Sequence, residues 1–345
     1  MDVIVTIDTE ADNQWDRSRT ELSTENLEFI PRFQDLCTRH GMKPTYLCTW
    51  EIVEDPRFDS LRRYQEAGLA EIGAHLHPWT TPPMESSQNG LDRGAFGTYP
   101  SELNQAIFRE KLRRLTKQIH SRTGIEPRSY RAGRWGFSAE QIPTLVSLGY
   151  LVDCSVTPLK SWRHVPGAGE GGPDFRAAPA RPYFLDLTDV CRSGESQLLE
   201  VPVTILFTKA RLARSKRLQD LYFRHRQTLP AKAMNRLLRL DPQWFRPYPH
   251  MSSKRLMSVY EAARDAGLPA VEMMLHSSEL MPGGSPYHHD EAAIERLYEK
   301  LERVFGHLQD ESCRGMTLAE FAQGQAGQVT HSARQSRERP GRPAG

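Results

Sequence analysis

The stretch "DVIVTIDTE", residues 2–10, is a run of branched apolar side chains that ends in Asp8 and Glu10. β-Branched residues favour strands, and a continuous apolar run of this length is typical of a buried strand. Alternate side chains of a strand share one face, so both carboxylates can enter one cavity. Two carboxylates there repel unless a cation separates them. We expect these acids to meet a divalent metal; the alternative is a pair of surface acids.

The same alternation of strand and helix continues along the chain. "TENLEFIPRFQDLCTRHG" (24–41) has helical spacing, "KPTYLCTW" (43–50) is a second strand, and "EIGAHLH" (71–77) is a third. Further strands are expected at 127–133, 150–156, 198–205 and 270–277, most of them separated by helices. Repeated βα units of this kind indicate a parallel sheet or barrel. The length of 345 residues is sufficient for one large α/β domain.

Polar residues gather where the predicted strands end, which is where active sites form in parallel α/β folds. "GAHLHPW" (73–79) contains His75 and His77, and an HxH pair at a strand end can reach one ion. Zinc binds histidine nitrogen and carboxylate oxygen and keeps a position for water. Two ordinary histidines are the alternative. Beside Asp8 and Glu10, the metal interpretation is the better one.

Two other strand ends carry candidate residues. "YRAGRWG" (130–136) places Arg131 at a strand end, where an arginine can hold a catalytic carboxylate in a bidentate pair. "MMLHSSEL" (273–280) places His276 after an apolar run, as suits a general acid oriented by Glu279 or Asp153. A surface ion pair and a buried structural histidine are the respective alternatives.

Several function classes lack support in the sequence. The motifs GxGxxG, GxxxxGK[ST] and GxSxG are all absent. Their absence argues against a dinucleotide-binding protein, a P-loop protein and a serine hydrolase, respectively. The five cysteines are scattered without a CxxC pair, against a disulfide framework or a cysteine zinc site. No apolar run approaches the ~20 residues of a membrane span, and the first residues resemble no secretory signal. We expect a reduced cytoplasmic protein.

One segment departs from the overall balance of charge. Residues 208–255 hold 13 lysines and arginines against Asp220 and Asp241, whereas the whole chain has a net charge of only +2. We interpret residues of about 206–256 as an inserted helical excursion that can attract an anionic membrane surface, or as a solvated lid. A membrane-surface or nucleic-acid protein built around this segment is a rival function, although we expect no nucleic-acid partner. The polar, Gly- and Pro-rich residues 326–345 are predicted to be a disordered tail.

The order of these motifs resembles the NodB-like polysaccharide deacetylases, the family 4 carbohydrate esterases, and within them the divergent WalW-like branch of lipopolysaccharide biosynthesis. "TIDTE", "EIGAHLHPW", "YRAGRWG", "LVDCSV" and "MMLHSS" match five family motifs in sequence, over most of residues 1–325. The resemblance implies a distorted (β/α)7–8 barrel that removes acetyl groups from an amino sugar or polysaccharide. It also implies a divalent metal, zinc by our expectation, and a carbohydrate substrate that is lipid- or nucleotide-linked. Such an enzyme would work in the cytoplasm, peripherally at the inner membrane.

Carried over by position, the resemblance implies a role for each residue. Asp8 would be the general base, Arg131 its partner, and His276 the acid that protonates the leaving group. The implied metal ligands are Glu10, His75 and His77, and the implied substrate-binding residues are Trp79, Arg134, Trp135 and Asp153. Thr9 stands where the family has its second aspartate, and Trp79 where it has its second histidine. The alternatives are an inactive sugar-binding homologue and another metal-dependent barrel amidohydrolase.

Overall fold

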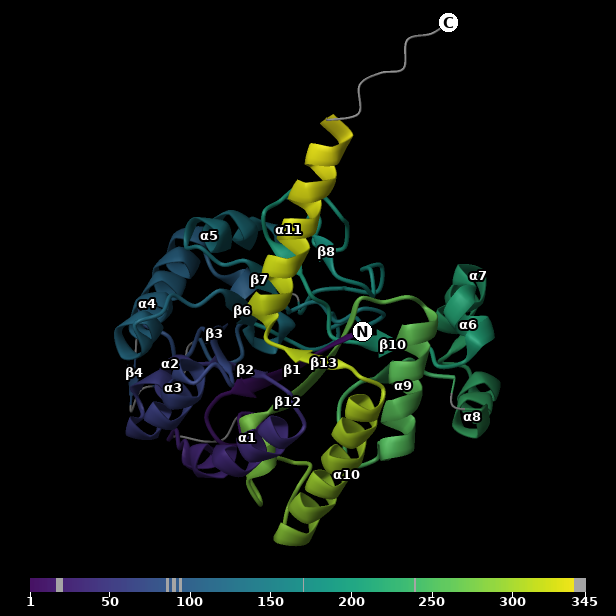
Figure 1. Cartoon of the computed structure of the whole chain (residues 1–345), viewed down its shortest axis with the longest axis horizontal. Coiled ribbons are helices and arrows are strands. Elements are labelled where there is room, and N and C mark those ends of the chain that lie inside the picture. Colours follow the sequence, from purple (N-terminus) through teal and green to yellow (C-terminus); the bar gives the residue numbers. More distant parts are fainter. Residues whose placement is uncertain are drawn as a thin grey trace, which may run out of the picture.

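The computed structural model describes residues 1–16, 21–84, 87–88, 91–92, 95–169, 171–238 and 240–337. Its centre is a curled sheet with helices around the outside (Figure 1). Seven strands of this sheet are parallel, in the spatial order β12, β1, β2, β3, β6, β7, β9. They are β1 (Asp2–Thr9), β2 (Pro44–Cys48), β3 (Glu71–Leu76), β6 (Ser129–Ala132), β7 (Val152–Asp153), β9 (Leu199–Glu200) and β12 (Ala270–His276).

The sheet curls until the segment that follows β9 reaches the opposite edge strand, β12. Beyond β9, the backbone N–H of Thr204 donates to the carbonyl of Glu272 on β12 at 3.3 Å. In return, the Glu272 N–H donates to Thr204 Oγ1 at 2.8 Å. Two short strands extend the sheet: β8 (Tyr183–Phe184) pairs antiparallel with β9, and β13 (Arg314–Met316) pairs with the start of β1. The expected distorted (β/α) barrel is confirmed.

The barrel is covered by amphipathic helices. The α-helices outside the basic segment are α1 (Ile30–Arg39), α2 (Trp50–Glu54), α3 (Asp59–Glu66), α4 (Gln105–Thr123), α5 (Ile142–Ser147), α9 (Ser253–Asp265), α10 (Glu291–Asp310) and α11 (Leu318–Arg337). Single turns of 3-10 helix lie at Glu25–Phe29, Pro56–Phe58, Pro100–Glu102, Gly133–Trp135, Ala139–Gln141 and Ser277–Leu280. In α10 the buried Ile294, Leu297, Leu301 and Val304 recur every three or four residues, which is the spacing of one helix face. A small hairpin, β4 (Ser87–Gln88) with β5 (Leu91–Asp92), lies apart from the sheet.

The two faces of β1 show how the sequence positions the site. Val3, Val5 and Ile7 face outward into the large core shared with the helices. Ile4 faces inward, into a smaller cluster that α11 closes with Leu318. Because side chains alternate, Thr6 and Asp8 face inward above Ile4. The barrel interior is therefore apolar at its amino end and polar toward its carboxyl end.

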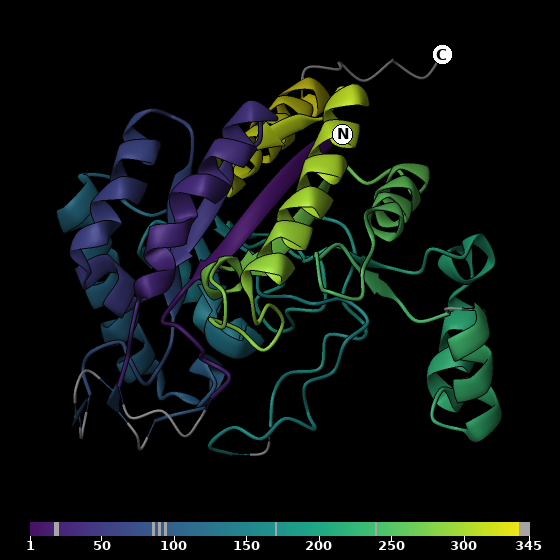
Figure 2. The same cartoon turned by 90° about the horizontal axis from the view of Figure 1, so that it is seen from below.

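The basic segment forms an arm that leaves the barrel. After β10 (Ile205–Leu206) the chain runs through α6 (Ala210–Arg214), α7 (Lys216–His225) and α8 (Leu229–Leu238), then returns in β11 (Gln243–Trp244). β10 and β11 pair antiparallel, and Figure 2 shows the three helices standing off to one side of the barrel.

The carboxyl-terminal segment is partly helical. Helix α11 runs through Arg337, so residues 326–337 of the predicted tail are helical, and residues 338–345 lie outside the described residues. Among the described helices, none combines the length and apolar character needed to cross a membrane.

Candidate active site and metal centre

The candidate site lies at the carboxyl ends of the parallel strands. The strand register pairs Asp8 with His276, and His75 with Arg131. Residues far apart in the sequence therefore lie side by side on neighbouring strands. A cavity of about 390 Å³ opens above them. Of the predicted residues, those that line it are Asp8, Glu10, His75, His77, Trp79, Arg134, Trp135 and His276.

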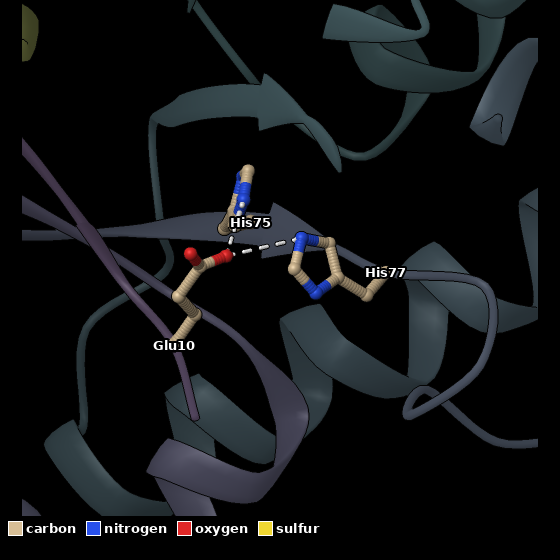
Figure 3. A group of neighbouring side chains, drawn as sticks. All are labelled: Glu10, His75 and His77. Carbon is tan, nitrogen blue, oxygen red and sulfur yellow. Dashed lines mark ion pairs between the residues drawn. The ribbon is translucent and has the colours of Figure 1, made fainter. Parts of the chain in front are cut away.

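Three side chains converge as a metal site would require (Figure 3). Glu10 Oε2 lies 3.6 Å from His75 Nε2 and 3.3 Å from His77 Nε2. The three ligand atoms lie within 4.8 Å of one another, and all three residues are buried. Among the described residues, this is the group of histidine, cysteine and acid side chains that could hold an ion.

The surroundings prepare both histidines to bind through Nε2. His75 Nδ1 lies 3.0 Å from the carbonyl of Arg131, to which it donates, so that in the neutral ring Nε2 carries the lone pair. Burial, with His75 close by, lowers the pKa of His77 well below its ordinary value, which keeps that ring neutral as a ligand must be. A Cβ at Gly133 would meet His77 Cδ2 at 2.4 Å, so only glycine lets the ring take this place.

Arg131 is fully buried beneath the cavity and holds Asp8. Its Nη1 donates to Asp8 Oδ1 at 2.6 Å, and its Nε donates to the carbonyl of Cys154 at 3.0 Å. Burial alone would raise the pKa of Asp8, but Arg131 and then His75 outweigh it and hold that pKa well below its usual range. Asp8 is therefore ionised, with Oδ1 engaged and Oδ2 directed toward the histidines.

Glu272, which was not predicted from the sequence, shares the same guanidinium. Arg131 Nη2 donates to Glu272 Oε1 at 2.6 Å and to Thr6 Oγ1 at 2.9 Å, and the Thr6 hydroxyl donates to Glu272. Burial raises the pKa of Glu272, against the effect of Arg131. The available signal was a lone acid inside the apolar run "AVEMML", at 270–275.

His276 is oriented by two further residues. Glu279 Oε1 lies 3.0 Å from His276 Nδ1 and accepts the backbone N–H of His276 at 3.0 Å. Arg246 Nη2 donates to the same Glu279 oxygen at 2.6 Å and lies 2.9 Å from His276 Nδ1. Burial would raise the pKa of Glu279, but Arg246 and His276 lower it to about 2. Glu279 was one of the two acids predicted to orient His276, the other being Asp153; Arg246, within the basic segment, was not predicted.

Aromatic side chains form much of the cavity wall. Trp79 stacks on His77 with ring centroids 4.3 Å apart, and Trp135 stacks on Trp162 at 6.4 Å. Trp244 packs edge-on against Trp135, at 6.1 Å. Trp162, in a loop, and Trp244, in the two-residue strand β11, both line the cavity and were not predicted as site residues, because a lone tryptophan in so short or irregular a segment gives no signal of its own.

Arg134 is held in an uncommon backbone conformation. Its φ is 54° and that of Trp135 is 64°, the left-handed region that costs non-glycine residues energy. Arg134 donates to the carbonyl of Pro166 at 2.9 Å and stacks over the ring of Tyr99. This tight turn after β6 directs Arg134 and Trp135 into the cavity.

Asp153 does not lie where substrate contact would require. It is fully buried, does not line the cavity, and accepts from the hydroxyl and N–H of Ser155 at 2.7 and 2.9 Å. Its neighbour is the buried Glu200, and burial raises the pKa of both carboxyls. Position two of a short strand turned Asp153 into the barrel wall, so its expected contact with substrate is replaced by a structural acid pair.

Comparison with known proteins finds solved structures with a similar fold, but no match by sequence. No family model matches the chain, and no curated protein matches its sequence. A provisionally assigned glycoside hydrolase/deacetylase from Parabacteroides distasonis matches the structure with a TM-score of 0.58, at 13% identity over 93% of this chain and 70% of its own.

Two other solved structures resemble the chain. A GH57 branching enzyme from Thermococcus kodakaraensis, solved with glucose, has a TM-score of 0.50 at 12% identity, over 93% of this chain and 70% of its own. A polysaccharide deacetylase, so assigned provisionally, from Mycobacterium smegmatis has a TM-score of 0.46 at 16% identity, over 92% and 93%. The chain thus shares its fold with the Parabacteroides distasonis and Thermococcus kodakaraensis structures.

Proposed function

We propose that this protein is a metal-dependent hydrolase that removes an acetyl group from an amino sugar or polysaccharide. The observation that carries the proposal is the meeting of Glu10, His75 and His77 with an arginine-held carboxylate and an oriented histidine at one cavity. That set supplies a metal site, a base and an acid, which together suffice to hydrolyse an acyl group.

The residues present suit a divalent metal. Both histidines direct Nε2 at Glu10, and one carboxylate with two imidazoles is a ligand set that catalytic zinc uses. A bound metal, zinc by our expectation, would lower the pKa of a water and polarise the acetyl carbonyl. Glu10, His75 and His77 would hold it, and Asp8 lies near enough to His75 to join them, with 4.0 Å between Oδ2 and Nε2.

The proton transfers follow from the contacts of Asp8 and His276. Asp8 Oδ2 accepts the proton of the attacking water, because Oδ1 already accepts from Arg131. The water oxygen bonds to the acetyl carbon, the bond from that carbon to the sugar nitrogen breaks, and acetate forms. His276 Nε2, 3.6 Å from Asp8 Oδ2, delivers a proton to the departing amine.

The cavity wall supports a sugar as the substrate. Trp135, Trp162 and Trp244 present ring faces and edges at one side, and flat apolar faces of sugar rings pack on such surfaces. Arg134, Trp79 and Trp135 line the cavity as substrate-binding residues would. The solved structures with this fold include a glycoside hydrolase/deacetylase and a branching enzyme bound to glucose.

The finer assignments complete the proposal. We infer a WalW-like enzyme of surface polysaccharide or lipopolysaccharide biosynthesis that acts in the cytoplasm on a lipid- or nucleotide-linked acetylated amino sugar. The five ordered motifs support this branch, and Thr9 and Trp79, which depart from the family's usual pattern, make it a divergent one.

The decisive test is release of acetate by metal-replete protein from UDP-linked and lipid-linked N-acetylhexosamines, with O-acetylated sugars in parallel. Asp8→Asn and His75→Ala should each abolish release. The matched controls Asp265→Asn and His164→Ala change exposed residues of the same types outside the cavity, and should retain it. Full activity of Asp8→Asn would show that the assignment of the base is wrong.

A second candidate, an inactive sugar-binding homologue, is favoured by one observation. Trp79 stands where a histidine ligand is expected and stacks on His77. This candidate predicts sugar binding without acetate release and without stoichiometric metal in the purified protein. Elemental analysis together with calorimetric titration of an N-acetylhexosamine distinguishes the two.

A further inference from the structure

The arm, defined as residues 207–242, is strongly basic. It holds ten lysines and arginines and two aspartates. Both aspartates are engaged within the arm: Asp220 pairs with Lys216 at 3.5 Å, and Asp241 accepts from Tyr222 and Asn235. Arg214, Arg217, Arg224 and Lys232 are exposed on the arm and give it a positive surface.

The arm also exposes an unusual amount of apolar surface. Of the ten large hydrophobic residues exposed in the described chain, six lie between residues 218 and 238. They are Leu218, Leu221, Leu229, Met234, Leu237 and Leu238, and Leu229 and Leu237 are each 82% exposed. Neither α6 nor α7 has a buried residue. The described barrel therefore covers little of the arm's apolar surface.

The pattern in α8 is that of a helix built to lie at an interface. Positions 229, 233 and 237 follow one another at four-residue spacing, and 234 and 238 adjoin them, so the apolar residues occupy one half of the helix. Lys232 and Asn235 occupy the other half. Leucine on one face and basic residues on the other are characteristic of helices that lie in the headgroup region of a membrane.

A groove between α6 and α8 combines the same two properties. Its volume is about 810 Å³, and both apolar residues (Leu212, Leu237 and Leu238) and basic ones (Lys209 and Arg211) line it. Apolar walls beside cationic side chains match a lipid, which has acyl chains beside a phosphate. We propose that the arm is a docking element for an anionic lipid membrane surface.

The position of the arm connects docking to the cavity. Residues Ile205 and Trp244 pair at the base of the arm, and Trp244 lines the cavity of the candidate active site. A docked arm would therefore hold the cavity mouth close to the membrane, where a lipid-linked substrate is carried. The docking itself does not depend on the proposed hydrolase activity.

The test is co-sedimentation of the full chain with vesicles, one set of phosphatidylcholine and one of an equal mixture with phosphatidylglycerol. We expect binding to the anionic vesicles only, weakened by added salt. Leu229→Ser with Leu237→Ser, and separately Arg217→Glu with Arg224→Glu, should each weaken binding by roughly tenfold or more.

The controls make matched changes elsewhere on the surface. Leu187→Ser with Ile125→Ser removes two exposed apolar residues, and Arg109→Glu with Lys117→Glu reverses two exposed charges on α4. Both should bind vesicles as the parent does, and circular dichroism should show every variant folded. The proposal would be overturned if the parent bound neutral vesicles equally well or bound no vesicles at all. It would also be overturned if the arm substitutions reduced self-association of the protein and left vesicle binding unchanged. None of these readouts uses acetate release, so a failed deacetylase assay leaves the test intact.

Discussion

Arg131 donates to Asp8 at 2.6 Å through Nη1 and to Glu272 at 2.6 Å through Nη2, with all three side chains buried. One cation thus compensates two carboxylates inside the barrel, one at the cavity and one below it. The catalytic base and the stability of the barrel depend on the same guanidinium.

Arg131→Gln should therefore destabilise the fold as well as stop catalysis. Removal of one partner of a buried ion pair costs about 3–5 kcal/mol, because the other charge stays buried and unpaired. The free energy of unfolding in urea measures this loss. Arg163→Gln, which removes an ion pair of a 76% exposed arginine with Asp174, should change stability by less than about 1 kcal/mol. Equal effects of the two substitutions would contradict the buried network.

The metal centre predicts a different pattern of losses. His75→Ala and Glu10→Gln should each lower zinc content measured by elemental analysis, and the zinc affinity by more than about 100-fold, since each removes one of three ligands. His77→Ala should do the same, even though Trp79 stacks on that ring. His164→Ala serves as the control. Retention of zinc by His77→Ala would show that Asp8 is the third ligand.

Much of the barrel and its site was predictable because strand periodicity fixes which side chains share a face. Asp8 and Glu10 lie two residues apart, as do His75 and His77. Alternation of side chains along a strand, together with parallel pairing of the strands, is therefore enough to bring these side chains together. The place of His276 was predictable because this residue ends an apolar run, which forms strand β12 in the structure.

Residues brought in by long loops were not predictable. Trp162 and Arg246 reach the cavity from segments without periodicity, so nothing in the local sequence fixes their direction. Asp153 shows the reverse error. Its motif pointed to the site, but its place in the two-residue strand β7 turned it toward Glu200.

Glu279 is predicted to act as a positioning residue. Glu279→Gln leaves the metal ligands in place but removes the anion between His276 and Arg246. We expect kcat to fall by roughly 10- to 100-fold with zinc content unchanged, less than the ~10²–10⁴-fold of a complete acid–base contribution, because His276 itself remains. Glu299→Gln on the surface of α10 is the matched control. A loss of zinc along with activity would assign Glu279 a structural role instead.

The tryptophan wall should act on substrate binding. Trp162→Leu removes the ring that stacks on Trp135, and we expect KM to rise by about tenfold while kcat changes little, because stacking acts equally on the bound and reacting sugar. Trp50→Leu, at a tryptophan that packs on the core away from the cavity, should leave KM unchanged. A fall in kcat without a change in KM would place Trp162 in the chemistry of the reaction.

The buried acid pair Asp153 and Glu200 predicts a dependence of stability on pH. Burial, and then Asp153, raises the pKa of Glu200 well above its ordinary value of 4.5, so the folded protein keeps a proton that the unfolded chain releases. Wherever the folded state binds more protons, stability falls as pH rises, here from about 4.5 upward through the folded pKa. Glu200→Gln cannot titrate, and its amide can donate to Asp153. From pH 5 to pH 8 the variant should gain at least about 1 kcal/mol relative to the parent. Thermal unfolding across that range measures the difference, with the exposed Glu195→Gln as the control. A gain by the parent over the variant as pH rises would show that Glu200 is ionised in the folded protein.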